Sequence, residues 1–391
     1  MHFGHAAWMH QQGKMERIMV VSFKRLAKRL ACATALAGLA MTTMAAAADV
    51  KIGIVAPMTG QLASEGQDME NAVKMAINAV NAKGGVNGDK IITTTADDAC
   101  DPQQAVTAGS KLVSEGVTAI VGGYCSGAVL PTLKIYGDAG IPFVIIGANS
   151  TKLVAANQGN AFLANSTGDM QATTAVELFK KNGYKKIAVI DEGDAYSSDL
   201  AKLTAEAFKG AGGEIATKET TTAGEQDYSA VVTKIKSSGA DAVFWTAYHA
   251  GGALLTKQLR QAGFQGGIVL GDGNNSPEYL EIAGSAGEGV YLLSPPTVDL
   301  LSGAADFKAK YKETYGRDAG AYAALSHDVG DLIVDAVTRA KSTDQKAIIE
   351  ALKASDFKGL AGEIKFTDKN TLQTSNFRPV VAKGGKWVAV E

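Results

Sequence analysis

The chain has 391 residues, of which 46% are hydrophobic and 20% are charged. Residues 1–48 hold six basic residues and one acid, so the remainder has 32 basic and 39 acidic residues and a net charge of −7. An acidic chain with scattered lysines argues against nucleic acid or an anionic membrane surface as the partner. About 340 residues exceed the size of one hydrophobic core, so we expect two lobes.

The N-terminal segment has the features of a secretory signal peptide. Four basic residues precede an apolar run at 30–44, and Ala46, Ala47 and Ala48 follow as a cleavage site. The apolar run is too short for a stable transmembrane helix. We therefore expect cleavage near Ala48 and a periplasmic protein without membrane insertion, rather than a retained amphipathic helix.

Strand and helix patterns alternate from residue 50 onward. The expected strands of the first series are 50–55, 91–96, 118–121 and 142–146, with helices at 69–80, 103–113 and 129–136 and a loop at 57–66. In the second series we expect strands at 186–190, 214–220, 242–246 and 267–270, with helices at 169–181, 198–211, 228–237 and 252–262. Later elements are a strand at 290–293, helices at 307–315 and 325–337, and strands at 362–366, 378–381 and 387–390.

This alternation predicts an α/β protein with two doubly wound parallel-sheet lobes. The late helices are expected to return to the first lobe, which gives a hinge of several strands that closes on a ligand. The expected division is a leader at 1–48, lobe 1 at 49–167 plus 297–372, and lobe 2 at 168–296 plus 373–391.

Cys100 and Cys125 are the two cysteines that remain after the leader is removed. Each follows a predicted strand, and a predicted helix lies between them. In a parallel βαβ unit the two strand ends meet at one edge of the sheet, which brings the thiols close enough for a disulfide in an exported protein. Two cysteines without neighbouring histidines do not make a zinc site.

The sequence contains no motif typical of an enzyme. It lacks a nucleophile elbow, a phosphate-binding P-loop and a metalloprotease helix. His249 and His327 lie in predicted helices and are interpreted as surface or interface residues rather than general bases. We therefore expect no catalytic residue, metal or cofactor.

Polar residues gather where predicted strands end. In chain order these residues are Ser126, the run Ala148-Asn149-Ser150, Asp191, Tyr196, Tyr248 and Asp272. In parallel sheets such positions share the ligand-binding edge. Hydroxyl donors suit an α-carboxylate and an acidic residue suits an α-ammonium, so the set is typical of a site for a zwitterion. Each residue taken alone is also an ordinary helix cap or turn former.

Four sequence blocks resemble one known family. They are residues 77–88, 97–102, 122–126 and 222–229, and the similarity extends over the mature chain. The chain resembles the periplasmic leucine/isoleucine/valine-binding proteins, the type I solute-binding components of ABC importers. The resemblance implies the type I periplasmic-binding-protein fold, Venus-flytrap closure on an amino acid, a monomer, and an inner-membrane ABC permease as partner.

The resemblance also assigns roles by position. It places the family's disulfide on Cys100 and Cys125, and the serine that grips the ligand carboxylate on Ser126. The remaining ligand contacts that it implies are Ala148, Asn149, Tyr196, Tyr248, Tyr322 and, for the ammonium, Asp272.

This chain departs from the family at the ligand contacts. Asn149 replaces threonine, and Asp272 is one methylene shorter than glutamate. Tyr124 stands where a smaller aliphatic is usual. Glu65 stands where an aromatic residue usually covers the ligand side chain. Glu65 is either solvated in a surface loop or faces the ligand, and the second alternative makes a polar or cationic amino acid credible.

Two other functional classes stay open from the sequence alone. A periplasmic sensor or chemosensory adaptor with the same fold would bind an amino acid or a related amide, and adjacent permease and ATPase genes would argue against it. A secreted hydrolase would turn its ligand over, although no residue pattern supports one.

Overall fold

The computed structural model describes residues 49–390, so the predicted signal peptide and its cleavage site lie outside the described residues. The first sheet is parallel throughout and has the strand order β2-β1-β3-β4-β5. Its strands are β1 (Val50–Ala56), β2 (Ile91–Asp97), β3 (Ala119–Gly122), β4 (Phe143–Ile145) and β5 (Ala161–Leu163). Because β1 pairs with both β2 and β3, the strand order reverses there, as in doubly wound sheets.

The second sheet has the order β14-β13-β10-β9-β8-β6-β7. Its parallel strands are β6 (Lys186–Asp191), β7 (Glu214–Thr220), β8 (Ala242–Trp245), β9 (Gly267–Leu270) and β10 (Tyr291–Ser294). The last two strands, β13 (Arg378–Lys383) and β14 (Lys386–Ala389), pair antiparallel at the edge. The expectation of purely parallel sheets is therefore wrong for these strands, because the two-residue turn at Gly384 and Gly385 makes them a hairpin.

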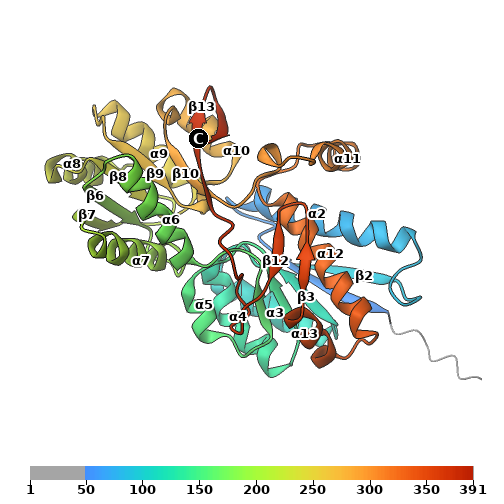
Figure 1. Cartoon of the computed structure of the whole chain (residues 1–391). Coiled ribbons are helices and arrows are strands. Elements are labelled where there is room, and N and C mark those ends of the chain that lie inside the picture. Colours follow the sequence, from blue (N-terminus) through green and yellow to red (C-terminus); the bar gives the residue numbers. More distant parts are fainter. Residues whose placement is uncertain (1–48, 391) are drawn as a thin grey trace, which may run out of the picture. The chain divides into compact units, whose positions relative to one another are not determined.

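Helices cover both faces of each sheet (Figure 1). Around the first sheet lie α2 (Ala63–Ala82), α3 (Pro102–Ser114), α4 (Ser126–Asp138), α5 (Thr151–Ala156) and α12 (Ala323–Ala340). Around the second lie α6 (Gly168–Lys181), α7 (Ser197–Gly210), α8 (Ser229–Ser238), α9 (His249–Gln261) and α10 (Pro277–Ala283). The other elements are α11 (Ala305–Tyr315), α13 (Gln345–Lys353) and a small antiparallel pair, β11 (Asp356–Lys358) with β12 (Glu363–Lys365).

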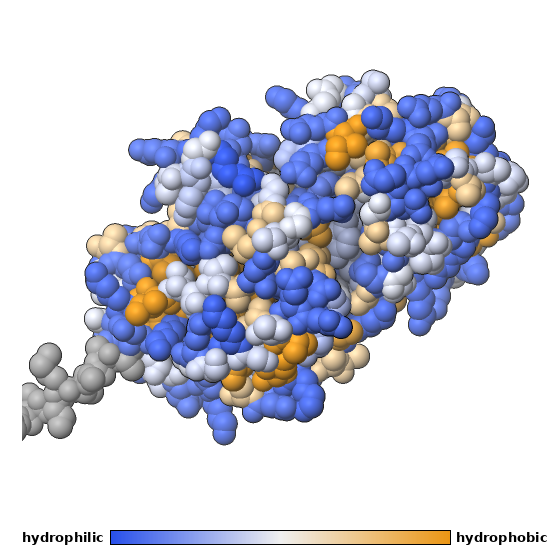
Figure 2. All heavy atoms as spheres, turned by 180° about the vertical axis from the view of Figure 1, so that it is seen from behind, coloured by the Kyte–Doolittle hydropathy of each residue, from blue (hydrophilic) through white to orange (hydrophobic). Residues whose placement is uncertain are grey.

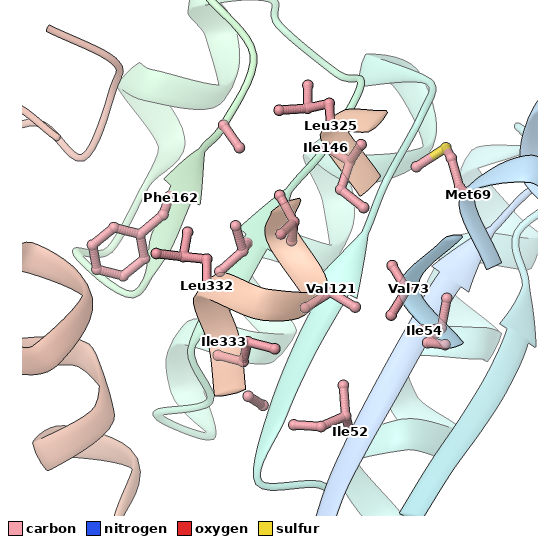
Figure 3. Packing of buried hydrophobic residues seen from close by; sticks show 14 of the residues in the cluster. Ile52, Ile54, Met69, Val73, Val121, Ile146, Phe162, Leu325, Leu332 and Ile333 are labelled. Carbon is pink, nitrogen blue, oxygen red and sulfur yellow. The ribbon is translucent and has the colours of Figure 1, made fainter. Parts of the chain in front are cut away.

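The late helix α12 returns to the first sheet, as predicted. Its residues Leu325, Leu332 and Ile333 pack with β-strand residues such as Val121 and with Val73 of α2 (Figure 3). Fully burying a side chain of this size stabilises the fold by about 1.5–3 kcal/mol. The chain consequently passes between the lobes after β5, after β10 and after β12, which is the multi-strand hinge that the sequence predicted.

The surface is mainly polar. Apolar residues are scattered in small groups on the face shown in Figure 2, and the large exposed hydrophobic side chains are Ile92, Val106 and Leu300. Within residues 49–390 no helix combines the length and the apolar character needed to cross a membrane.

Candidate functional site

A buried carboxylate, Asp272, lies at the carboxyl end of β9 and is 2% exposed. Four neutral side chains donate hydrogen bonds to it. The donors are the hydroxyls of Tyr196 and Tyr322, each at 2.8 Å, and the amides of Asn149 and Asn165, at 3.1 Å to Oδ2. Each donor follows a strand or begins a helix, so the site is built from loops at the strand ends.

The Asp272 site lacks a compensating positive charge. Burial raises the pKa of the Asp272 carboxyl, and the hydrogen bonds from Tyr196 and Tyr322 oppose that rise. Between residues 49 and 390, no ion pair involves Asp272. An ionised carboxylate in such surroundings is stabilised by any ligand that brings a cation.

Aromatic rings surround Asp272. Ring centroids lie 5.4 Å apart for Tyr196 and Tyr248 and also for Tyr124 and Tyr322, while Tyr124 and Tyr248 are 6.3 Å apart. With Asp272, these rings and three small residues line a cavity of only about 10 Å³; the small residues are Gly147, Ala148 and Gly273. We call this the inner cavity. Its walls come from both lobes.

Ser126 is the first residue of α4 and is not among the residues that line the inner cavity. Its hydroxyl accepts hydrogen bonds from the backbone N–H groups of Asn149 and Ser150, each at 3.2 Å, and so joins the loops that follow β3 and β4. Gly122 lets the end of β3 lie against β1, because a Cβ at its φ of +120° would meet the Val55 carbonyl oxygen at 2.0 Å.

The acidic motif at residues 97–101 shapes the neighbouring loop. Asp97 accepts hydrogen bonds from the N–H groups of Met58 and Ala99, and Asp98 accepts one from Cys100. Asp101 caps α3. Cys100 is disulfide-bonded to Cys125 with the Cα atoms 5.4 Å apart, which confirms the predicted disulfide.

Glu65 lies in the first turn of α2 and is only 6% exposed. The alternative of a solvated loop residue is therefore wrong, and the predicted loop at 57–66 ends earlier, at Ala63. Its Oε1 lies 3.5 Å from Nδ1 of His249, and Nε2 of His249 lies 3.1 Å from Glu278. Burial raises the pKa of the Glu65 carboxyl, and the nearby His249 opposes this rise.

A second cavity, of about 300 Å³, lies beyond Tyr248. We call it the outer cavity. Tyr248 lines both cavities, and His249, Glu192, Asp194 and the disulfide line the outer one. This volume is at the lower end of the range usual for small-molecule sites, roughly 300–1,000 Å³.

Glu192 gives the protein a testable pH dependence. Burial first, and then the charges of Asp194 and Asp191, raise its pKa to about 8. Because an acid with a raised folded-state pKa binds its proton more tightly when folded, its contribution to stability is present at low pH and is lost as pH rises from about 4.5 to 8. We expect Glu192→Gln to reduce the fall in the free energy of unfolding over this range, measured by urea denaturation. Equal pH slopes in both proteins would contradict this assignment.

Most of the residues predicted to bind the ligand are brought together. Tyr124, Ala148, Tyr196, Tyr248, Asp272 and Tyr322 line the inner cavity, and Asn149 bonds to its carboxylate. Asp191 does not line it, since its side chain accepts a hydrogen bond from the N–H of Gly193. Sequence reasoning missed Asn165, which follows the three-residue strand β5, a run too short to show periodicity.

Comparison with known proteins gives consistent matches. A model of the family described as periplasmic binding protein matches residues 49–386. A Leu/Ile/Val-binding protein homolog of Brucella melitensis is 31% identical, with 89% of this chain and 95% of the relative covered. A leucine-, isoleucine-, valine-, threonine- and alanine-binding protein of Pseudomonas aeruginosa is also 31% identical, covering 89% and 94%. The isoleucine complex of LivJ from Streptococcus pneumoniae is 26% identical, with 88% and 98% covered and a TM-score of 0.80.

Proposed function

This chain belongs to the periplasmic binding protein family, and we propose that it binds an amino acid between its lobes and delivers it to an inner-membrane ABC permease. The relatives are named for binding leucine, isoleucine and valine, and one of them also for threonine and alanine, and LivJ is described as the substrate-binding protein of a branched-chain amino acid transporter. Members of this family bind substrates and are not enzymes. The permease partner, a monomeric state and periplasmic localisation after signal cleavage are parts of this proposal.

The observation that carries the proposal is the buried Asp272 carboxylate, which no described cation neutralises. An α-ammonium group supplies the missing charge. Its N–H groups would donate to Asp272 and to Oδ1 of Asn149, a buried acceptor that has no partner among the described residues. We assign the carboxylate end of the ligand to the loop of Ser126, at the N-terminus of α4, where backbone N–H groups favour an anion.

Contacts between the lobes support closure around the ligand. Asn149 and Tyr322 reach Asp272, and Ser150 donates a hydrogen bond to Asp199 of α7 at 2.8 Å. Sheet membership supports the proposed division into 49–167 plus 297–372 and 168–296 plus 373–391, since β13 and β14 join the second sheet while α12 packs on the first.

A thermal-shift screen of the twenty amino acids, followed by calorimetry, tests the proposal. Because a ligand that binds only the folded state raises its stability, one or a few amino acids should raise the melting temperature and bind with one site per chain. D-amino acids and amino-acid amides serve as controls, since they misplace or neutralise one charged end. A screen in which no amino acid raises the melting temperature would contradict the proposal.

A further inference from the structure

Several buried polar atoms near the inner cavity have no hydrogen-bond partner among the described residues. They are both carboxylate oxygens of Glu65, the hydroxyl of Tyr124 and Nδ1 of His249. Leaving such a group unpaired is destabilising, and more so when the group is charged. Glu65 and Tyr124 come from the first lobe and His249 from the second, so a shared partner would occupy a point where the lobes meet.

These atoms lie next to the proposed amino-acid site. Burial and then the negative charges of Glu65 and Asp272 raise the pKa of Tyr124, so both carboxylates lie near its phenol. Tyr322 lines the inner cavity and also a small cavity beside Glu65. A ligand whose ammonium binds Asp272 therefore has its side chain within reach of Glu65.

His249 offers Glu65 only a long contact. Its Nε2 lies 3.1 Å from Glu278, whereas its Nδ1 lies 3.5 Å from Oε1 of Glu65, a separation longer than that of a good N–H···O hydrogen bond. A donor group on the ligand would therefore give the Glu65 carboxylate a closer partner.

The outer cavity is lined by acidic and not by basic residues. Asp194 and Glu192, the latter with a pKa of about 8, line it together with His249, and neither lysine nor arginine is among its described lining residues. An aliphatic side chain would leave the buried Glu65 carboxylate without a close donor, whereas a cationic donor would supply one.

We propose that Glu65, Tyr124 and His249 form a subsite for a ligand side chain that carries a positively charged hydrogen-bond donor, such as a guanidinium group. This inference rests on the proposed function, since it concerns the other end of the same amino acid. It assigns the ligand to a cationic class, whereas the ligands named for the relatives have uncharged side chains.

Calorimetry with three probes tests this subsite. L-arginine carries the cationic donor, L-citrulline is nearly the same shape without the charge, and L-leucine is aliphatic. The full chain should bind arginine most tightly. Glu65→Gln should weaken arginine binding by about 10- to 100-fold and change leucine binding by less than about threefold, because only the charge interaction is lost. Glu65→Tyr should shift the preference further toward leucine.

Glu70→Gln is the matched control. Glu70 lies on the same helix, is 8% exposed, and has its carboxylate bonded to Lys74 and Thr95, so its loss should leave the ligand ranking unchanged. Circular dichroism and melting curves establish that each variant folds, and Glu65→Gln should melt at the same or a higher temperature because an unpaired buried charge is removed.

Three outcomes would overturn the subsite. The subsite would be wrong if the unmodified protein bound leucine more tightly than arginine. It would also be wrong if Glu65→Gln left the ratio of the arginine and leucine affinities unchanged. A uniform loss for all three probes would show that Glu65 and His249 only hold the lobes together. In each of these cases the protein still binds an amino acid, so the proposed function is not contradicted. If the protein bound no amino acid at all, both the subsite and the proposed function would be wrong.

Discussion

Asp272→Asn should weaken amino-acid binding by about 2–5 kcal/mol, because it removes one partner of a buried charge pair and leaves the ligand ammonium uncompensated. The structure supports a large effect. Asp272 is 2% exposed, and its four described hydrogen-bond donors are all neutral. The measurement is calorimetric titration of the unmodified chain and the variant with the amino acid that the screen identifies.

Two further variants separate charge from packing. Asp272→Glu keeps the charge and has the length of the family's glutamate, so it should retain more affinity than Asp272→Asn. Asp191→Asn is the control. Asp191 is an equally buried aspartate at the end of β6, in the same sheet as β9, and its carboxylate accepts a hydrogen bond from the N–H of Gly193. If Asp272→Asn left the affinity unchanged, another acidic residue would have to be the partner of the ligand ammonium.

Periodicity predicted the fold well where elements are long. The strand 214–220 and the strand 267–270 were predicted with the observed bounds, and most helices differ by a few residues at their ends. The elements that were missed are short, such as β5 and α10, or lie in the polar C-terminal segment, such as α13. A run of three to nine residues offers too few turns or alternations for its period to be recognised.

The start of α2 shows why Glu65 was left undecided by sequence. Leu62 occupies the N-cap position and has no side-chain acceptor for the first N–H groups, so the usual start signal is missing. The apolar spacing becomes visible only from Met69 onward. Packing against the other lobe determines this first turn, and such long-range contacts cannot be predicted from the local sequence pattern.

His249 illustrates the same limit for the site. The sequence left His249 as either a surface or an interface residue, and the structure shows an interface position. The side chain is 1% exposed and lies next to Glu65 of the first lobe and Glu278 of the second. In contrast, Tyr196, Tyr248 and Asp272 were found because strand ends in parallel sheets share one edge, a rule that needs only the order of elements.

Removal of the disulfide should be the largest single loss of stability. Replacing Cys100 and Cys125 together with serine should lower the free energy of unfolding by about 3–4 kcal/mol on the chain-entropy model, because the sequence separation of 25 residues sets the loop that is no longer closed when the chain unfolds. Urea denaturation under oxidising conditions measures this difference. In reducing buffer the free energies of unfolding of the unmodified chain and the double variant should become nearly equal.

The disulfide also has a binding consequence. Cys100 and the preceding Ala99 adopt positive φ values of 56° and 45°, which non-glycine residues rarely adopt, and the bond to Cys125 holds this loop beside Ser126. The double variant should therefore bind its amino acid more weakly as well, even at temperatures where it is fully folded. Thiol titration of the unfolded, non-reduced mature protein should detect no free thiol. Two free thiols, or equal free energies of unfolding in the two proteins, would refute a stabilising disulfide. The hydrogen bonds of Asp97 and Asp98 would then be the contacts that hold the loop.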